Sequence, residues 1–272
     1  MTDDGSRVAS FTCRGHRISY RAYGDGPRLI VLTHGLLMDH RMYTRLAPVL
    51  AEAGHRVVAV DMLGHGASDQ PHDMTLYSMP QYGRDLIALL DHLGATQAVV
   101  GGTSLGANVA LEAAVAAPER IRALVLEMPV LENALPAAAA AFVPLALALR
   151  VSMPTMRLVS RLTRLIPRSN FLLDMMLDFA RRDPAASLAV LDGLTFGRTA
   201  PPPEERKALR HPTLVVGHPS DPIHPFSDAD RVGRELREAQ VVVARSIAEW
   251  RVSPKYLDAQ LLSFLSRVWA PT

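Results

Sequence analysis

The sequence is poor in cysteine, in aromatic side chains and in net charge. Cys13 is the single cysteine among 272 residues, so an intramolecular disulfide and a cysteine metal cluster are both excluded. The 29 basic residues are balanced by 27 acidic ones without a basic stripe interleaved with aromatics, so we expect no nucleic-acid partner. Hydrophobic residues make up 49% of the chain, which allows a sizeable core and excludes disorder as the main state.

Long apolar runs are also scarce. Residues 1–5 open acidic and lack an apolar run, which is unlike a secretory signal. The longest apolar stretch covers the 16 residues 134–149 and is interrupted by Pro136 and Pro144. A membrane-spanning helix needs about 20 apolar residues. We therefore expect a buried helix pair or a lid there, no membrane partner and a cytoplasmic location.

Short strand patterns alternate with helical patterns along most of the chain. The strand patterns are uninterrupted and apolar, which is typical of a sheet covered on both faces. The alternation predicts an α/β fold with a mostly parallel, doubly wound sheet. Strands are expected at residues 28–33, 56–60, 98–100, 123–127, 213–217 and 240–244, after a leading hairpin at 8–13 and 17–23. Helices are expected at residues 43–53, 79–93, 105–117, 228–239 and 254–269.

One segment, residues 129–203, breaks the alternation. It is rich in alanine, leucine and methionine, and prolines divide it. We interpret it as a helical cap inserted into a core formed by residues 1–128 and 204–272. Its apolar composition favours a small apolar molecule as substrate or ligand, although part of it must form the cap's own core. Pairing with a second copy through so apolar a cap stays open.

A serine flanked by glycines lies between a predicted strand and a predicted helix, in Gly102-Thr103-Ser104-Leu105-Gly106. Glycines two positions either side of a serine allow a tight turn that exposes the serine hydroxyl at the edge of the sheet. The start of the following helix offers backbone N–H groups and a positive dipole end to a developing anion. The pattern therefore indicates nucleophilic chemistry at Ser104.

With this motif, the chain from about Ile18 to Leu265 resembles the α/β-hydrolase fold superfamily, in its serine-nucleophile branch with a helical lid. His34-Gly35 follows the first central strand, where the family has its oxyanion-loop motif. Residues 61–69 look like the family's loop after the next strand, and Asp221 follows the strand at 213–217, where the family carries its triad acid. The insertion at 129–203 also lies where the family keeps its lid.

The resemblance implies a role for each matching residue. Ser104 would be the nucleophile, Asp221 the acid, and the backbone N–H groups of Leu36 and Leu105 the oxyanion hole. It implies no cofactor and no metal, and the sequence contains no HExxH pattern. A serine in place of an aspartate disfavours the alkyl-enzyme route of the family's dehalogenases and epoxide hydrolases.

The chain departs from the family where the catalytic histidine should follow the last strand. The segment 245–252 contains no histidine, and Ala248 or a neighbour occupies the usual position. His224, three residues after Asp221, could replace the missing base, or it could be a loop histidine that caps backbone groups. Glu249 could also act as a base, but a solvated charge or a structural pair explains it as well. Glu127 ends a predicted strand where some relatives place their acid, and a salt bridge is its plainer explanation.

Two functions therefore remain open at this point. One is a cofactor-independent hydrolase of a small apolar ester, thioester or lactone, acting through Ser104, Asp221 and His224. The other is a non-hydrolytic descendant of the fold, either a ligand-binding protein or an isomerase, cyclase or lyase that uses the pocket and the oxyanion hole. A third explanation for the missing histidine is that Ala248 was introduced into an otherwise ordinary hydrolase.

Overall fold

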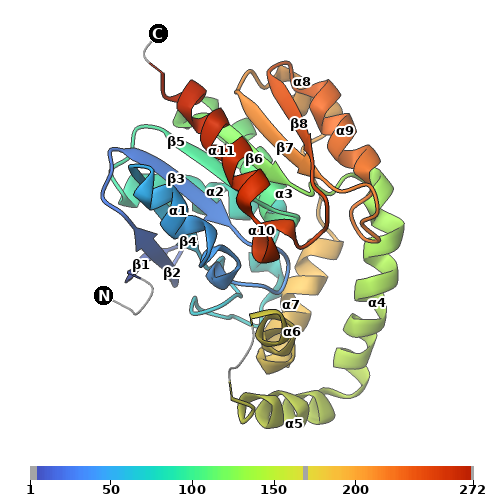
Figure 1. The fold of residues 1–272 in the computed structure, drawn as a ribbon. Coiled ribbons are helices and arrows are strands. Elements are labelled where there is room, and N and C mark those ends of the chain that lie inside the picture. The colour runs from blue at the N-terminus through green and yellow to red at the C-terminus, as the bar shows by residue number, and fades with distance from the viewer. Residues whose placement is uncertain (1–4, 168–170, 271–272) are drawn as a thin grey trace.

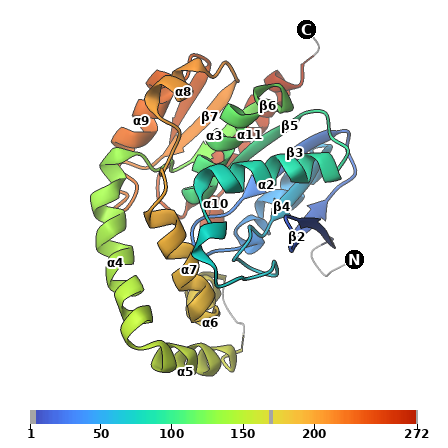
Figure 2. The same ribbon diagram turned by 180° about the vertical axis from the view of Figure 1, so that it is seen from behind.

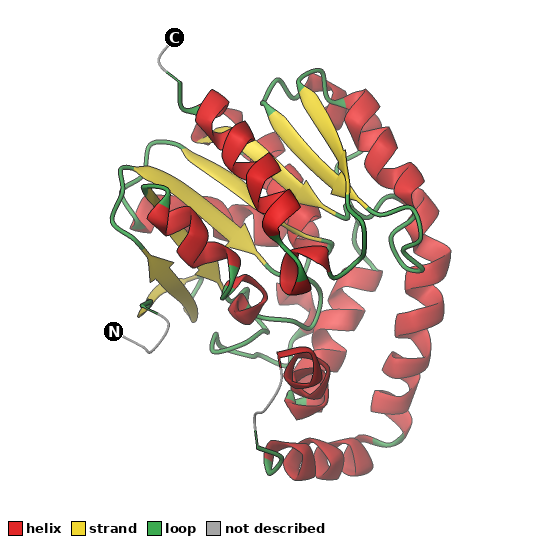
Figure 3. Ribbon diagram, in the orientation of Figure 1, coloured by secondary structure: helices red, strands yellow, loops and turns green. Residues whose placement is uncertain are grey.

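A computed structural model describes residues 5–167 and 171–270 and contains one eight-stranded sheet (Figures 1 and 3). The strand order is β1-β2-β4-β3-β5-β6-β7-β8. The first two pairings, β1 with β2 and β2 with β4, are antiparallel, and all later ones are parallel. The strands are β1 (Arg7–Cys13), β2 (His16–Tyr23), β3 (Arg28–Thr33), β4 (His55–Val60), β5 (Ala98–Thr103), β6 (Ile121–Glu127), β7 (Thr213–Gly217) and β8 (Ala239–Val243).

Helices cover both faces of the sheet, because successive strand residues point to opposite sides. Along β3, Leu29 and Val31 belong to one core cluster, which also receives α2 (Met79–His92), α3 (Leu105–Ala116) and α9 (Phe226–Glu235). Ile30 and Leu32 belong to the other cluster, with α1 (Leu46–Glu52) and α11 (Lys255–Val268). Figures 1 and 2 show these two layers from opposite sides. The predicted doubly wound sheet is confirmed.

Element ends differ from the sequence expectation in places. Strand β5 continues through Gly101 and Gly102 to Thr103, because these residues still pair with β3 and β6, whereas glycines weaken a strand pattern in sequence. The helix expected at 43–53 is divided into a short 3-10 helix, η1 (His40–Tyr43), and α1. Further short helices are η2 (Met74–Leu76), η3 (Pro118–Arg120), α8 (Pro203–Ala208) and α10 (Glu249–Val252).

All regular elements in the described part of the segment 129–203 are helices, and they lie beyond the carboxyl ends of the parallel strands (Figure 3). It contains η4 (Glu132–Ala134), α4 (Leu135–Val151), α5 (Met153–Arg164), α6 (Phe171–Arg181) and α7 (Pro184–Thr195). We refer to this helical segment as the lid, and in Figures 1 and 2 α5 lies at its end farthest from the sheet.

The apolar stretch at 134–149 is one continuous helix, so the expectation of a helix pair broken by prolines is wrong. Pro144 lies inside α4 and is exposed, on the side where water can satisfy the carbonyl that a proline leaves free. Together with η4, the helical stretch Glu132–Val151 reaches 20 residues, and by length and composition alone it could cross a membrane. Little of it is buried inside the molecule.

Candidate active site

Ser104 occupies a strained turn between β5 and α3. Its φ of +56° and ψ of −113° lie outside the regions that residues with a Cβ prefer, as the sharp strand-to-helix turn requires. The flanking glycines are there because of close approach to β3. A Cβ at Gly102 would lie 2.3 Å from the Thr33 carbonyl oxygen, and one at Gly106 would lie 2.0 Å from it. Both positions therefore exclude any larger residue while the elbow keeps this shape.

Ser104, His224 and Asp221 form a chain of hydrogen bonds. The Ser104 Oγ lies 2.9 Å from His224 Nε2, and His224 Nδ1 lies 2.9 Å from Asp221 Oδ2. The acid and the histidine come from one loop between β7 and α9, and the serine from the elbow after β5. The structure thus brings together the three side chains that the sequence analysis selected, and their catalytic roles remain a prediction.

Asp221 is arranged to stay ionised. Burial raises its pKa, but the hydrogen bonds from the His224 ring and from the backbone N–H groups of His224 and Ile223 outweigh it, and the net pKa is lowered. Its Oδ1 accepts those two N–H groups at 2.9 and 2.8 Å, which leaves Oδ2 for the ring. A carboxylate there requires Nδ1 to carry the proton, so Nε2 is free to accept from the Ser104 hydroxyl.

The two amides expected to form the oxyanion hole lie in loops or helix starts. Leu105 begins α3, where the first N–H groups have no partner within the helix. Leu36 lies in the loop after β3, next to Leu37 with its φ of +57°. Within residues 5–167 and 171–270, neither amide donates a hydrogen bond. Both therefore have a free donor.

His34 and His65 are structural rather than basic groups. The ring of His34 bonds the Gly35 carbonyl oxygen through Nδ1 at 2.8 Å and accepts the Met62 N–H on Nε2 at 3.1 Å, which ties the oxyanion loop to the loop after β4. The two rings are in contact, with centroids 4.8 Å apart and planes tilted by 50°. Burial lowers the pKa of both histidines, so both are held neutral.

The loop after β8, where the family histidine is missing, contains a buried ion pair instead. Arg251 on α10 pairs with Glu127 at the end of β6, and its Nη2 donates to the Thr103 hydroxyl at 2.8 Å. Burial lowers the pKa of Arg251, but Glu127 raises it, with a net rise that keeps the guanidinium charged. A salt bridge is therefore the role of Glu127. Arg251 was missed from the sequence, although a buried carboxylate at a strand end signals that a cation must come from somewhere.

Two further polar residues are buried. Glu249 is buried, which excludes a solvated charge, and one of its carboxylate oxygens accepts the Arg245 backbone N–H, so of the alternatives left open for it the structural one agrees with its contacts. His55 is also buried, and burial is the first cause of its lowered pKa. Ala248 immediately precedes α10 and is its N-cap residue.

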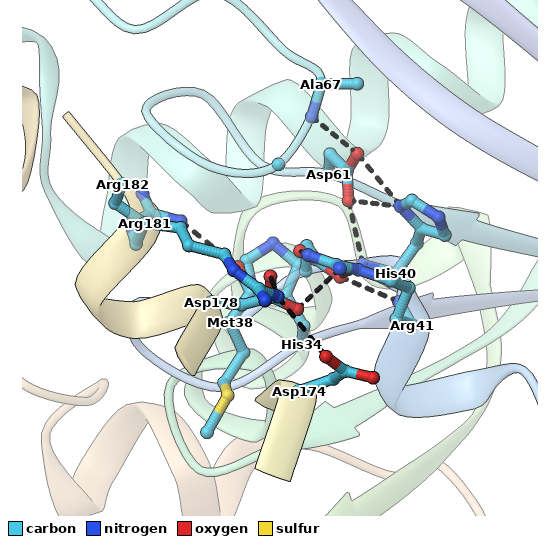
Figure 4. A network of polar contacts seen from close by, with 12 residues as sticks. His34, Met38, His40, Arg41, Asp61, Ala67, Asp174, Asp178, Arg181 and Arg182 are labelled. Atoms are coloured by element: carbon cyan, nitrogen blue, oxygen red, sulfur yellow. Dashed lines mark hydrogen bonds and ion pairs between the residues drawn. The ribbon is translucent and has the colours of Figure 1, made fainter. Parts of the chain in front are cut away.

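A second polar network joins the lid to the core (Figure 4). Asp61 after β4 accepts hydrogen bonds from His40 and from the Ala67 N–H, at 2.7 to 3.0 Å. Arg41 in η1 bonds Asp39 in the loop after β3 and reaches Asp178 on lid helix α6 at 2.5 Å. Asp39, His40 and Asp61 converge as metal ligands do, but these contacts already occupy their polar atoms. The network thus positions α6 over the oxyanion loop.

Comparisons with known proteins agree with this architecture. A family model described as the alpha/beta hydrolase fold matches residues 28–225. The bifunctional epoxide hydrolase 2 of Sus scrofa is 36% identical over 110 residues, which are 40% of this chain and 20% of that protein. Epoxide hydrolase B of Mycobacterium tuberculosis is 37% identical over 118 residues, 42% of this chain and 33% of that protein. The match thus spans about a fifth and a third of these relatives.

Solved structures extend the similarity to nearly the whole chain. The enol-lactonase from Burkholderia xenovorans matches with a TM-score of 0.77 and 20% identity, covering 95% of this chain and 100% of the other. At that identity, the similarity demonstrates a shared fold.

Proposed function

Because the chain belongs to the α/β-hydrolase fold family, we propose that it is a serine hydrolase of a small apolar ester, thioester or lactone. Ser104 is the nucleophile, His224 the general base and Asp221 the acid that orients it. The observation that carries this proposal is the hydrogen-bond chain from Ser104 Oγ through the His224 ring to Asp221. It supplies a base for a family member whose last-strand histidine is absent.

Each step of the reaction has a group to carry it. His224 Nε2 takes the Ser104 hydroxyl proton as Oγ attacks the carbonyl carbon, and Asp221 stabilises the imidazolium. The carbonyl oxygen becomes an oxyanion that the Leu36 and Leu105 N–H groups can bind. The imidazolium then gives its proton to the departing alcohol or thiol, which leaves an acyl-enzyme. Water, deprotonated by the same ring, releases the acid and regenerates Ser104.

Epoxide hydrolysis, the activity in the names of the curated relatives, fits this site poorly. A carboxylate that opens an epoxide forms an ester, which water can cleave. A serine hydroxyl that opened the same ring would form an ether, which has no carbonyl for water to attack. The Ser104 nucleophile therefore favours acyl transfer over epoxide opening.

The test is turnover of a p-nitrophenyl ester panel by the intact chain and three variants. Ser104→Ala and His224→Ala are each expected to lower kcat by roughly 10⁴- to 10⁶-fold, and the double variant should lose no more than the worse single one. His218→Ala is the matched control, since this nearby histidine bonds the Arg245 carbonyl oxygen instead. It should keep activity within about threefold.

Three results would count against the proposal. Unchanged turnover in His224→Ala would reject this residue as the base. Unchanged turnover in Ser104→Ala would reject the nucleophile. No turnover above buffer in the intact chain, combined with tight binding of apolar ligands, would favour the non-hydrolytic descendant.

A further inference from the structure

The outer end of the lid exposes large apolar side chains on α5 and at its two ends. Leu158, Leu162 and Leu165 follow helical spacing and are 54%, 55% and 77% exposed, and Val151 at the end of α4 is 76% exposed. The opposite face of α5 is the packed one, where Ser160 is buried and its hydroxyl bonds the Arg181 and Arg182 carbonyl oxygens. We call Val151, Leu158, Leu162 and Leu165 the lid tip.

Several large apolar side chains exposed along one helix face are unusual on a monomeric soluble protein and indicate an interaction site. Figures 1 and 2 both place α5 beyond the rest of the lid, so a flat surface could reach the lid tip without meeting the sheet or its covering helices. The shape therefore favours a broad, flat partner over a deep groove on another protein.

Along the sequence the lid tip is flanked by basic residues, of which Arg150 pairs with Asp192 on α7. Between Glu132 and Asp174 the sequence contains five arginines and no acidic residue. Arg157 and Arg161 are exposed on α5, each directly before a lid-tip leucine, and within the described residues neither has an acidic partner. An apolar stripe flanked by unpaired arginines is the pattern of a helix that lies at the interface of an anionic bilayer, with its guanidinium groups at the phosphates.

We propose that the lid tip docks the protein on an anionic lipid surface, with α5 parallel to the membrane plane. This is surface association through exposed residues, and it requires no spanning helix. A symmetric contact between two lid tips would bring unpaired arginines of both copies together, which like-charge repulsion disfavours. The charge thus selects the lipid surface over a second copy. The inference does not depend on the proposed ester chemistry.

The experiment is co-sedimentation of the intact chain with vesicles of phosphatidylcholine alone or mixed with phosphatidylglycerol. We expect binding to the mixed vesicles that weakens as salt is raised. Arg157→Gln combined with Arg161→Gln should lower the partition constant about 25-fold, roughly fivefold for each charge. Leu158→Ser combined with Leu162→Ser should lower it by about tenfold or more.

Matched control variants lie far from the lid. Arg234→Gln combined with Arg237→Gln removes two exposed arginines from and just after α9, and Val8→Ser removes an exposed apolar side chain from β1. Both should bind vesicles as the intact chain does. Ser104→Ala should also bind normally, which separates docking from catalysis.

Several outcomes would overturn the proposal. Absence of binding to the mixed vesicles would reject it, as would equal binding to neutral and anionic vesicles. Loss of binding in the control variants as large as in the lid-tip variants would reject the assignment to α5. A dimer that Leu158→Ser with Leu162→Ser dissociates, without vesicle binding in the intact chain, would replace the lipid surface by a second copy.

Discussion

Removing the buried guanidinium of Arg251 should destabilise the protein far more than removing a surface arginine. The Arg251 side chain is 6% exposed and its partner Glu127 is 3% exposed. Substituting Arg251→Met leaves the Glu127 carboxylate buried without its cation and removes a donor to the Thr103 hydroxyl. Breaking a buried ion pair in this way costs about 3–5 kcal/mol. We therefore expect the free energy of unfolding to fall by that amount.

The measurement is urea unfolding followed by far-ultraviolet circular dichroism, with a surface pair as control. Arg234 is 71% exposed and pairs with Asp230 at 2.8 Å. Arg234→Met should change stability by no more than about 0.5 kcal/mol. The double variant Glu127→Leu with Arg251→Met should be more stable than Arg251→Met alone, because two apolar side chains replace an uncompensated charge.

A second readout links this pair to the elbow, since Thr103 precedes Ser104 and the Ser104 N–H donates to the Glu127 backbone carbonyl oxygen at 2.8 Å. Arg251→Met should therefore lower ester turnover at temperatures where it is still folded, and Arg251→Lys should keep part of the stability. A loss below about 1 kcal/mol for Arg251→Met, or a double variant as unstable as the two single losses added together, would refute the reasoning.

Three further predictions concern other groups. Burial raises the pKa of Asp39, but contacts with Arg41 outweigh burial and lower this pKa to about 2. The Asp39 carboxylate therefore stabilises the fold at pH values above its unfolded pKa, and this stabilisation is lost as the pH falls from about 4 to 2. Asp39→Asn should remove about 2 kcal/mol of stability at neutral pH and flatten acid unfolding followed by circular dichroism. Burial raises the pKa of Cys13 to about 11, so its thiol should resist iodoacetamide until the chain is unfolded, as mass spectrometry would detect. Ala248→His should add nothing to ester turnover while His224 holds the Ser104 hydroxyl, and a gain of several orders of magnitude would contradict this.

Local patterns predicted the central features of the fold and the site. The elbow is visible in sequence because two glycines, a serine, a strand and a helix lie within a few residues of one another. Asp221 and His224 are three residues apart, so their proximity also follows from sequence. The contact between the His224 ring and Ser104 does not follow from sequence, because it joins residues 120 positions apart.

Features that depend on distant contacts were missed. Arg251 and Glu127 are 124 residues apart, and nothing near either one identifies the other. The course of α4 was missed for another reason. Prolines usually end helices, but Pro144 lies on an exposed side of the helix, where the carbonyl that loses its partner is open to solvent. Propensity rules cannot reveal which side of a helix faces solvent before its packing is known.

The proposed role of His224 as the base accounts for the residues found in the loop after β8. A histidine there would have to stay near Ser104, so the loop could not also fill the space beside the elbow with other groups. With His224 three residues from Asp221, the segment around Ala248 is released from that requirement, and Arg251 can enter the core and pair with Glu127. A change at His224 should therefore alter turnover with little effect on stability, whereas changes at Arg251 should act on stability first. A variant set that reversed this order would show that the loop after β8 still takes part in the chemistry.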